Sequence, residues 1–380
     1  MTSSPAFRTE DFRWMGRALE LAERGAGLTS PNPMVGAVVV AAGRAVGEGF
    51  HARAGGPHAE IEALAKTGKA ARGATLYVTL EPCNHTGRTP PCADAIKRAG
   101  IQRVVAAMAD PNPRVVGGGT ATLSNAGIEA LLGCREREAL LLNRAFVSSA
   151  RWGRPHVTLK WAATVDGKIA DGQGTSKWIT GPRARLEAHR LRSHADAVVV
   201  GISTALADDP ALDVRLGAPW PREPLRVVVD STARLPVGSR VIRGSEGTGR
   251  PERAVIAVTD AADPERLAAL EARGVTVLRC KAHEGRVDLV DLLARLGALG
   301  AIGVLVEGGS QLAGAFLEAG VVDRVVAFAA PVLLGGAGAP GTVGGLGLPL
   351  PDGVRLEEMA IRPVESDWII EGDVRRGSRP

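Results

Sequence analysis

One histidine, one glutamate and two cysteines occur in an order that suits zinc chemistry. His58 and Glu60 lie in the stretch PHAE, Cys83 ends the stretch EPC after a predicted strand, and Cys92 opens the next predicted helix. Imidazole and thiolate are ligands that zinc prefers, and three protein ligands leave a fourth tetrahedral position for water. Zinc lowers the pKa of such a water to about 7, which supplies hydroxide at neutral pH. Glu60 could reach this water without binding the metal.

The same residues partly match the pattern of zinc-dependent deaminases. The H-x-E and P-C parts are present, but Cys92 lies nine positions after Cys83, with NHTGRTPP between them. Two alternatives are a chance grouping of free cysteines and a structural zinc site. A structural site is disfavoured because only His85 stands nearby as a fourth ligand. The spacing therefore favours a catalytic site with His58, Cys83 and Cys92 as zinc ligands and Glu60 as the proton shuttle.

A second candidate site lies in the C-terminal half. The segment VLVEGGSQLAGAF (304–316) predicts a strand, two glycines and a helix start. A helix N-terminus that follows glycines can bind an anion with its backbone N–H groups. The segment has neither the G-x-G-x-x-G pattern nor a P-loop, so it does not indicate a standard Rossmann domain. An ordinary tight turn between a strand and a helix is the alternative.

Periodic elements in the N-terminal part predict an α/β domain. Apolar residues at helical spacing indicate a helix over 11–25, and continuous apolar runs indicate buried strands. Strands alternating with short helices are typical of layered α/β domains. Further helices are expected at 58–67 and 91–99, with strands at 35–43, 74–80 and 101–108.

The C-terminal part continues the alternation after a predicted linker, SSARWGRP (148–155). A length of 380 residues suggests at least two domains. We expect one over residues 1–150 and another over 151–380, with a polar loop at 206–215 and a glycine-rich loop at 335–347. Strands are expected at 156–162, 196–200, 225–229, 254–258, 302–307 and 324–329, and helices at 182–194, 263–273, 287–297 and 310–319.

Composition and charge exclude several classes of function. The formal net charge is +5 and no block of five basic residues occurs, which disfavours polybasic membrane or nucleic-acid binding. Aromatic residues make up 3% of the chain, too few for stacking platforms. The first fifteen residues lack the apolar core of a signal peptide, so we expect a cytoplasmic protein. In that compartment a cysteine pair indicates a metal or catalytic site more than a disulfide.

The stretches HAEIEALAKTG and TLYVTLEPCNHTGRTPPCADAI resemble the deaminase half of the bifunctional riboflavin-biosynthesis deaminase–reductase family. SPNPMVGAVVV and DPNPRVVGGG resemble the same family. The resemblance implies a cytidine-deaminase-like three-layer α/β/α domain. It also implies that a ring amino group of 2,5-diamino-6-(5-phosphoribosylamino)pyrimidin-4(3H)-one is hydrolysed to a carbonyl. The substrate contacts that it implies are Asn32, His51, His85 and Arg88.

The segments HVTLKWAATVDGKIA, GTSKWITG, LADDPALDVR and VLVEGGSQLAGAF resemble the reductase half of that family. This half has a dihydrofolate-reductase-like α/β fold, and it uses NADPH to reduce the ribosyl group to ribityl. The cofactor contacts that the resemblance implies are Ala162, Trp178, Thr204, Asp208, Gly309, Ser310, Gln311, Leu312, Ala313, Gly314 and Ala315. The substrate contacts are Lys160, Ser176, Arg192, Leu212, Arg215 and Glu307.

Other readings stay open from the sequence. One is a zinc deaminase with a non-catalytic, ligand-binding C-terminal domain. A nucleic-acid-editing deaminase would require Cys-x-x-Cys spacing, which is absent. A non-enzymatic zinc module would require a fourth protein ligand. The family resemblance also implies a homo-oligomer, expected to be a dimer formed through the reductase half, that acts on a small molecule without nucleic-acid or membrane partners.

Overall fold

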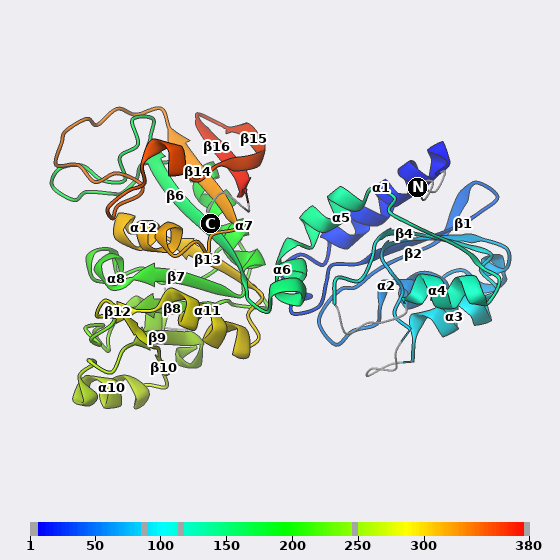
Figure 1. Ribbon diagram of the computed structural model, residues 1–380, viewed down its shortest axis with the longest axis horizontal. Helices are drawn as coiled ribbons and strands as arrows, with labels where there is room; N and C mark the ends of the chain where they lie inside the picture. Colours follow the sequence, from blue (N-terminus) through cyan, green and yellow to red (C-terminus); the bar gives the residue numbers. More distant parts are fainter. Residues whose placement is uncertain (1–6, 85–89, 113–117, 245–249, 376–380) are drawn as a thin grey trace. The chain divides into compact units, whose positions relative to one another are not determined.

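The chain forms two compact units, one up to Gly153 and one from Arg154 (Figure 1). The structure is a computed structural model, and it describes residues 7–84, 90–112, 118–244 and 250–375. The expectation of a linker at 148–155 is wrong for most of its length, because helix α6 (Arg144–Trp152) continues to Trp152. Gly153 ends this helix in the left-handed conformation, with φ 65°. A glycine adopts that conformation without the steric cost of a Cβ atom.

The first unit contains a mixed sheet with the strand order β2–β1–β3–β4–β5. Strand β1 pairs antiparallel with both β2 and β3, and the strands β3, β4 and β5 run parallel. The strands are β1 (Gly36–Ala41), β2 (Arg44–Phe50), β3 (Thr75–Leu80), β4 (Arg103–Met108) and β5 (Glu129–Leu132).

Helices cover this sheet in two groups. Helix α1 packs on β1 and β3 and contacts α5, whereas α2 packs on β1 and β2 and contacts α3, which in turn contacts α4 (Figure 1). The unit is thus a three-layer α/β/α domain, as predicted. Its helices are α1 (Thr9–Glu23), α2 (Ala59–Ala65), α3 (Cys92–Ala99), α4 (Gly119–Asn125), α5 (Glu136–Leu142) and α6, with a 3-10 turn at Gly68–Ala71.

The second unit is built on a long sheet with the order β10–β9–β8–β7–β13–β6–β14–β16–β15. Neighbouring strands from β10 to β14 are parallel, and β16 and β15 add an antiparallel edge. The strands are β6 (His156–Thr164), β7 (Ala197–Gly201), β8 (Leu225–Val229), β9 (Ala254–Val258), β10 (Thr276–Arg279), β13 (Gly303–Glu307), β14 (Arg324–Ala330), β15 (Leu356–Val364) and β16 (Asp367–Val374). A separate hairpin pairs β11 (Ala282–His283) with β12 (Arg286–Val287).

Both faces of this sheet are buried. Val199 belongs to the apolar cluster on one face, and its neighbours Val198 and Val200 belong to the cluster on the other. Side chains alternate between faces along a strand, so a continuous valine run is typical of a sheet covered on both sides. The helices are α7 (Pro182–His194), α8 (Ile202–Asp208), α9 (Arg240–Arg243), α10 (Pro264–Glu271), α11 (Leu289–Ala298) and α12 (Ser310–Glu318), with 3-10 turns at Pro251–Arg253 and Leu350–Asp352.

The structure tests two segments that the sequence predicts as loops. The segment expected as a polar loop at 206–215 begins inside α8, which ends at Asp208. The glycine-rich stretch 335–347 contains neither helix nor strand, as expected, apart from a single bridge between Lys168 and Gly341. Among the described residues, no helix combines the length and the hydrophobicity needed to cross a membrane.

Candidate active sites

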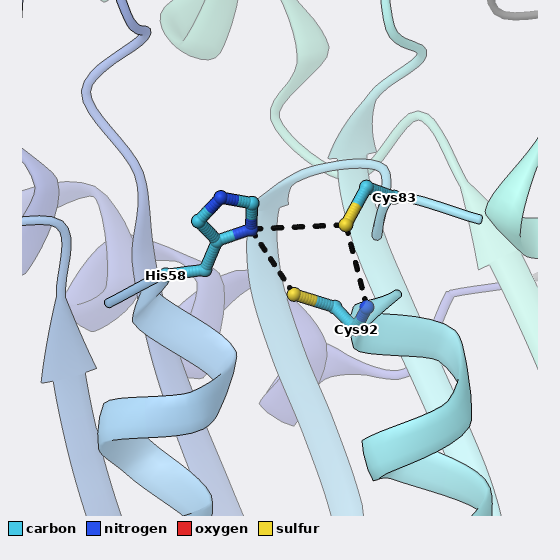
Figure 2. A group of neighbouring side chains, drawn as sticks. All are labelled: His58, Cys83 and Cys92. Atoms are coloured by element: carbon cyan, nitrogen blue, oxygen red, sulfur yellow. Dashed lines mark hydrogen bonds between the residues drawn. The ribbon is translucent and has the colours of Figure 1, made fainter. Parts of the chain in front are cut away.

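His58, Cys83 and Cys92 meet at one end of the first unit's sheet. His58 is the residue before α2, Cys83 follows β3, and Cys92 is the first residue of α3. Their ligand atoms lie within 4.8 Å of one another. The ring nitrogen Nδ1 of His58 is 3.2 Å from the Cys92 sulfur and 3.7 Å from the Cys83 sulfur. Figure 2 shows both sulfur atoms facing this nitrogen.

These separations fit a tetrahedral zinc ion. Zinc–nitrogen bonds of about 2.0 Å and zinc–sulfur bonds of about 2.3 Å at the tetrahedral angle place nitrogen and sulfur about 3.5 Å apart. The backbone N–H of Cys92 also donates to the Cys83 sulfur, at 3.3 Å. The hydrogen bond with the Cys92 side chain lowers the pKa of Cys83 to about 4, burial opposes that change, and His58 adds to it. The donor set therefore suits a cation that binds thiolate.

Glu60 lies beside this group, but its carboxylate is not among the three candidate ligands. Glu60 is the second residue of α2, and its buried side chain interacts with the Cys92 thiol. Burial raises the pKa of the Glu60 carboxyl above its ordinary value. A buried carboxyl next to an open metal position is typical of a group that accepts and returns protons.

Asn32 and His51 form a pair next to the cysteine–histidine group. The Asn32 amide nitrogen is 3.1 Å from His51 Nε2, and His51 Nδ1 is 2.9 Å from the Pro57 carbonyl oxygen. The rings of His51 and His58 are 6.0 Å apart. Two of the residues predicted to contact the deaminase substrate therefore lie together beside the candidate zinc ligands. The other two, His85 and Arg88, lie outside the described residues.

The second unit contains a cavity of about 880 Å³. Its lining includes Gly201 at the end of β7 and Glu307 at the end of β13, so it lies at the carboxyl ends of parallel strands. Ligands of open α/β sheets bind in this position. The residues predicted to contact the reductase substrate all line it: Lys160, Ser176, Arg192, Leu212, Arg215 and Glu307.

Three of those residues form a charged cluster inside the cavity. Arg192 donates to both oxygens of the Glu307 carboxylate, and the Lys160 ammonium lies 3.6 Å from the same carboxylate. The side chains of Lys160 and Arg192 are each 14% exposed. Burial alone would raise the pKa of Glu307, but Arg192 and Lys160 outweigh it and lower the pKa to about 2. Burial lowers the pKa of Lys160.

Most of the residues predicted to contact the cofactor line the same cavity. These are Ala162, Trp178, Thr204, Asp208, Gly309, Ser310, Gln311, Leu312 and Ala313. Gly309 precedes α12 and has no side chain to occupy its first turn, so the backbone at this helix start faces the cavity. A dinucleotide with its phosphates at α12 fits this lining.

Gly314 and Ala315 are outside the residues that line the cavity. Gly314 faces the loop at 344 instead, where a Cβ atom would come within 2.2 Å of the Gly344 carbonyl oxygen. Gly344 also donates its backbone N–H to the Ser310 carbonyl, at 2.8 Å. The glycine at 314 therefore allows the 335–347 loop to pack against α12.

Sequence reasoning missed two polar residues of α7 that line the cavity, Arg185 and His189. The Arg185 guanidinium lies 4.5 Å from the centre of the Trp178 ring, and His189 Nδ1 accepts the Arg215 backbone N–H at 3.2 Å. Together with Arg192 they stand at positions i, i+4 and i+7, on one face of the helix. That spacing of polar residues in a helix was the signal available in the sequence.

Two family models match the chain. The one described as the cytidine and deoxycytidylate deaminase zinc-binding region matches residues 8–108, and the one described as the RibD C-terminal domain matches residues 155–370.

Full-length relatives and solved structures match nearly the whole chain. Riboflavin biosynthesis protein RibD of Aquifex aeolicus is 42% identical over 94% of this chain and 93% of its own length. RibD of Escherichia coli is 43% identical, covering 86% of this chain and 89% of its own. A structure of Acinetobacter baumannii RibD covers 97% of this chain and 99% of its own, with 37% identity and a TM-score of 0.85.

A Thermotoga maritima structure, titled a diaminohydroxyphosphoribosylaminopyrimidine deaminase/5-amino-6-(5-phosphoribosylamino)uracil reductase, has 36% identity and a TM-score of 0.80. It covers 96% of this chain and 99% of its own. The matches extend through both units and through the segments that carry both candidate sites, so this chain belongs to the RibD family of bifunctional deaminase–reductases of riboflavin biosynthesis.

Proposed function

We propose that the unit ending at Gly153 deaminates 2,5-diamino-6-(5-phosphoribosylamino)pyrimidin-4(3H)-one and that the unit beginning at Arg154 reduces the product with NADPH. The observation that carries the proposal is that each unit holds its own site. One has the His58–Cys83–Cys92 group, and the other has a cavity with a buried Lys160–Arg192–Glu307 cluster.

In the deaminase unit, His58, Cys83 and Cys92 hold zinc. When bound, zinc supplies Lewis acidity at an open fourth position and lowers the pKa of water there. Glu60 takes a proton as the water oxygen adds to the ring carbon that bears the amino group, and it returns a proton to that nitrogen. The carbon–nitrogen bond then breaks, ammonia leaves, the second proton of the water passes to a ring nitrogen, and the oxygen stays as a carbonyl. Asn32, held by His51, orients the pyrimidine edge; His85 and Arg88 are further proposed substrate contacts.

In the reductase unit, the cavity binds both NADPH and the deaminated intermediate. NADPH, when bound, would supply a hydride to C1′ of the ribosyl group; the C1′–O4′ bond would break, O4′ would take up a proton from solvent, and the group would become ribityl as NADP⁺ forms. Arg192 and Arg215 bind the anionic part of the substrate, and Glu307, fixed by Arg192 and Lys160, accepts hydrogen bonds from ribose hydroxyls. Ser176 and Leu212 complete the substrate side. Trp178 and the start of α12 hold the two ends of the cofactor.

The test supplies each substrate separately to the zinc-loaded protein. We expect ammonia release from the pyrimidine phosphate and loss of the NADPH absorbance with the deaminated intermediate. Glu60→Gln should abolish ammonia release and leave NADPH oxidation intact. A folded protein that releases ammonia but never oxidises NADPH would instead support the single-activity deaminase. If Glu60→Gln stops both reactions, the assignment of two separate sites is wrong.

The assembly and location of the protein are further parts of the proposal. We propose a homodimer formed through the reductase unit, which light scattering of the full chain and of variants in that unit would test. A cytoplasmic location stays a prediction from the sequence.

A further inference from the structure

His189 lies on α7, in the wall of the reductase cavity, and its two ring nitrogens have different surroundings. Nδ1 accepts the backbone N–H of Arg215 at 3.2 Å. A ring nitrogen accepts a hydrogen bond only when it carries no proton, so the proton of the neutral ring resides on Nε2. The interaction thus fixes both the tautomer and the orientation of the ring.

Burial and the charges around the ring keep it neutral. Burial, with a further contribution from the neighbouring Arg192 and Arg215, lowers the pKa of His189 to about 4, while Glu307 and Asp213 partly oppose this change. The acceptor state of Nδ1 therefore persists at neutral pH.

The 213–215 segment is held by α7 at two points. His189 accepts the N–H of Arg215, and Arg192, one turn further along α7, donates to the Asp213 carbonyl oxygen at 3.1 Å. Leu212, just before the segment, has φ 55°. That left-handed conformation is unfavourable for leucine, so contacts from outside must hold the chain in this shape. The two residues of α7 supply such contacts.

Arg215 needs this support because its own side chain is exposed. The side chain is 54% exposed, and its described ion pair is with Asp213, at 3.4 Å. An arginine on a loop loses considerable conformational freedom when it binds an anion. A backbone that is already fixed reduces that loss, since the guanidinium then starts from the cavity wall.

We propose that His189 is a positioning residue of the reductase site, which holds the backbone of Arg215 so that its guanidinium meets the substrate phosphate. The inference rests on the proposed function, because it takes Arg215 as a phosphate contact. His189 acts through Arg215 and takes no part in the hydride transfer.

The test measures KM for the deaminated substrate and kcat for NADPH oxidation in the full-length zinc-loaded protein. His189→Leu removes the acceptor, and we expect KM to rise roughly three- to tenfold with little change in kcat. His189→Asn places an amide oxygen close to the position of Nδ1 and should restore most of the affinity. His194→Leu is the matched control, since His194 is exposed on the same helix and is outside the cavity lining.

A double-mutant cycle with Arg215→Ala tests whether the effect passes through Arg215. If it does, His189→Leu changes KM little when Arg215 is already alanine. Urea unfolding of the reductase unit reports whether each variant is folded, and ammonia release by the same protein shows that the deaminase unit is unaffected.

The outcomes separate the two proposals. If Arg215→Ala leaves KM unchanged, Arg215 is not a phosphate contact and the proposed substrate assignment fails. If Arg215→Ala raises KM but His189→Leu does not, or if the two effects simply add, the positioning role of His189 is overturned. A His189→Asn variant as impaired as His189→Leu also overturns it.

Discussion

Arg192 and Glu307 form a two-point ion pair inside the reductase unit. The guanidinium donates from Nε at 2.7 Å and from Nη2 at 3.0 Å to the two carboxylate oxygens. Such planar pairs are both strong and directional. Because Lys160 lies 3.6 Å from the same carboxylate, a single anion faces two cations in a mostly buried position. The loss of that anion would leave two positive charges without compensation.

Glu307→Gln should therefore destabilise the reductase unit, by about 3–5 kcal/mol at neutral pH. Urea unfolding, monitored by hydrogen exchange of peptides from β13, measures the change in the free energy of unfolding. The exposed Glu271, on α10, provides the control, since Glu271→Gln should change this free energy little.

The pH dependence of this difference has a definite sign. The pKa of Glu307 is about 2 in the folded protein, against an ordinary value of 4.5. A carboxyl with a lowered pKa stabilises the fold fully above its unfolded pKa, and this contribution is lost as the pH falls through 4.5 toward 2. The stability gap between the wild type and Glu307→Gln should shrink over that window. A gap that stays constant down to pH 2 contradicts the assignment.

Much of the fold followed from local patterns. The predicted ranges of β8, β9 and α7 agree with the structure residue by residue. Strand β9 is a short run of aliphatic residues, β8 is one apart from Arg226, and α7 begins with a proline at its first position, where the missing N–H costs nothing. Elements of this kind carry their own start and stop signals.

Strand β2 was missed because its sequence contains glycines where a strand is expected to have larger residues. A Cβ atom at Gly47 or Gly49 would come within 2.4 Å of backbone oxygens of α2. The glycines let α2 lie directly on the strand, a requirement of tertiary packing that local propensity does not contain. The edge strand β15 was missed because it is largely exposed and lacks a buried apolar run, and its neighbour β16 was missed with it.

The site residues also include some that the sequence could predict and some that it could not. His58, Cys83 and Cys92 were predictable because each residue type points to a metal and each stands at the end of an element. The helical spacing of His189 and Arg192 could have placed His189 in the cavity wall, but its contact could not be predicted, because its partner is a backbone N–H 26 positions along the chain. The two α12 residues expected at the cofactor but found outside the cavity lining, Gly314 and Ala315, show that a motif does not specify which helix face is exposed.

Removal of zinc should separate the two activities. A chelator should abolish ammonia release, because His58, Cys83 and Cys92 lie in the deaminase unit, and it should leave NADPH oxidation with the deaminated substrate unchanged. Metal analysis should find one zinc per chain. Cys92→Ala should lose the zinc, whereas Cys134→Ala, which replaces a buried cysteine outside the site, should retain it. Loss of NADPH oxidation on chelation would contradict the separation.

Asp166 should control the affinity for NADPH through the 335–347 loop. Its carboxylate accepts the backbone N–H groups of Leu334 and Gly335, at 3.3 and 2.7 Å. Pro340 and Thr342, further along that loop, line the cavity. Asp166→Ala releases the anchor, so we expect KM for NADPH to rise roughly tenfold, with a smaller change in kcat.

The control for this prediction is a second aspartate that accepts backbone N–H groups. Asp263 accepts those of Glu265 and Arg266 at the start of α10, away from the cavity lining. Asp263→Ala should cost about 1 kcal/mol of stability and leave KM for NADPH unchanged. Equal effects of the two variants on KM would assign the change to general destabilisation.

Asp11 should be a sensitive position for the stability of the deaminase unit. Its carboxylate is fully buried and receives hydrogen bonds from both terminal nitrogens of Arg103, at 2.7 and 2.9 Å, and from the Tyr77 hydroxyl, at 2.8 Å. Asp11→Ala leaves the guanidinium of Arg103, which is 6% exposed, without its buried partner. We expect a loss of about 3–5 kcal/mol in the free energy of unfolding, measured by hydrogen exchange of peptides from β4.

The double variant Asp11→Leu/Arg103→Met distinguishes the cost of an unpaired charge from the value of the pair. Replacement of both charges by apolar side chains of similar size removes the desolvation penalty together with the attraction. We therefore expect the double variant to be clearly more stable than Asp11→Ala, although it lacks the ion pair completely. Deaminase activity should follow the same order, because the pair joins α1 to β4 and neither residue belongs to the His58–Cys83–Cys92 group. A double variant no more stable than Asp11→Ala would show that the attraction between these two residues, and not the penalty of an unpaired arginine, dominates at this position.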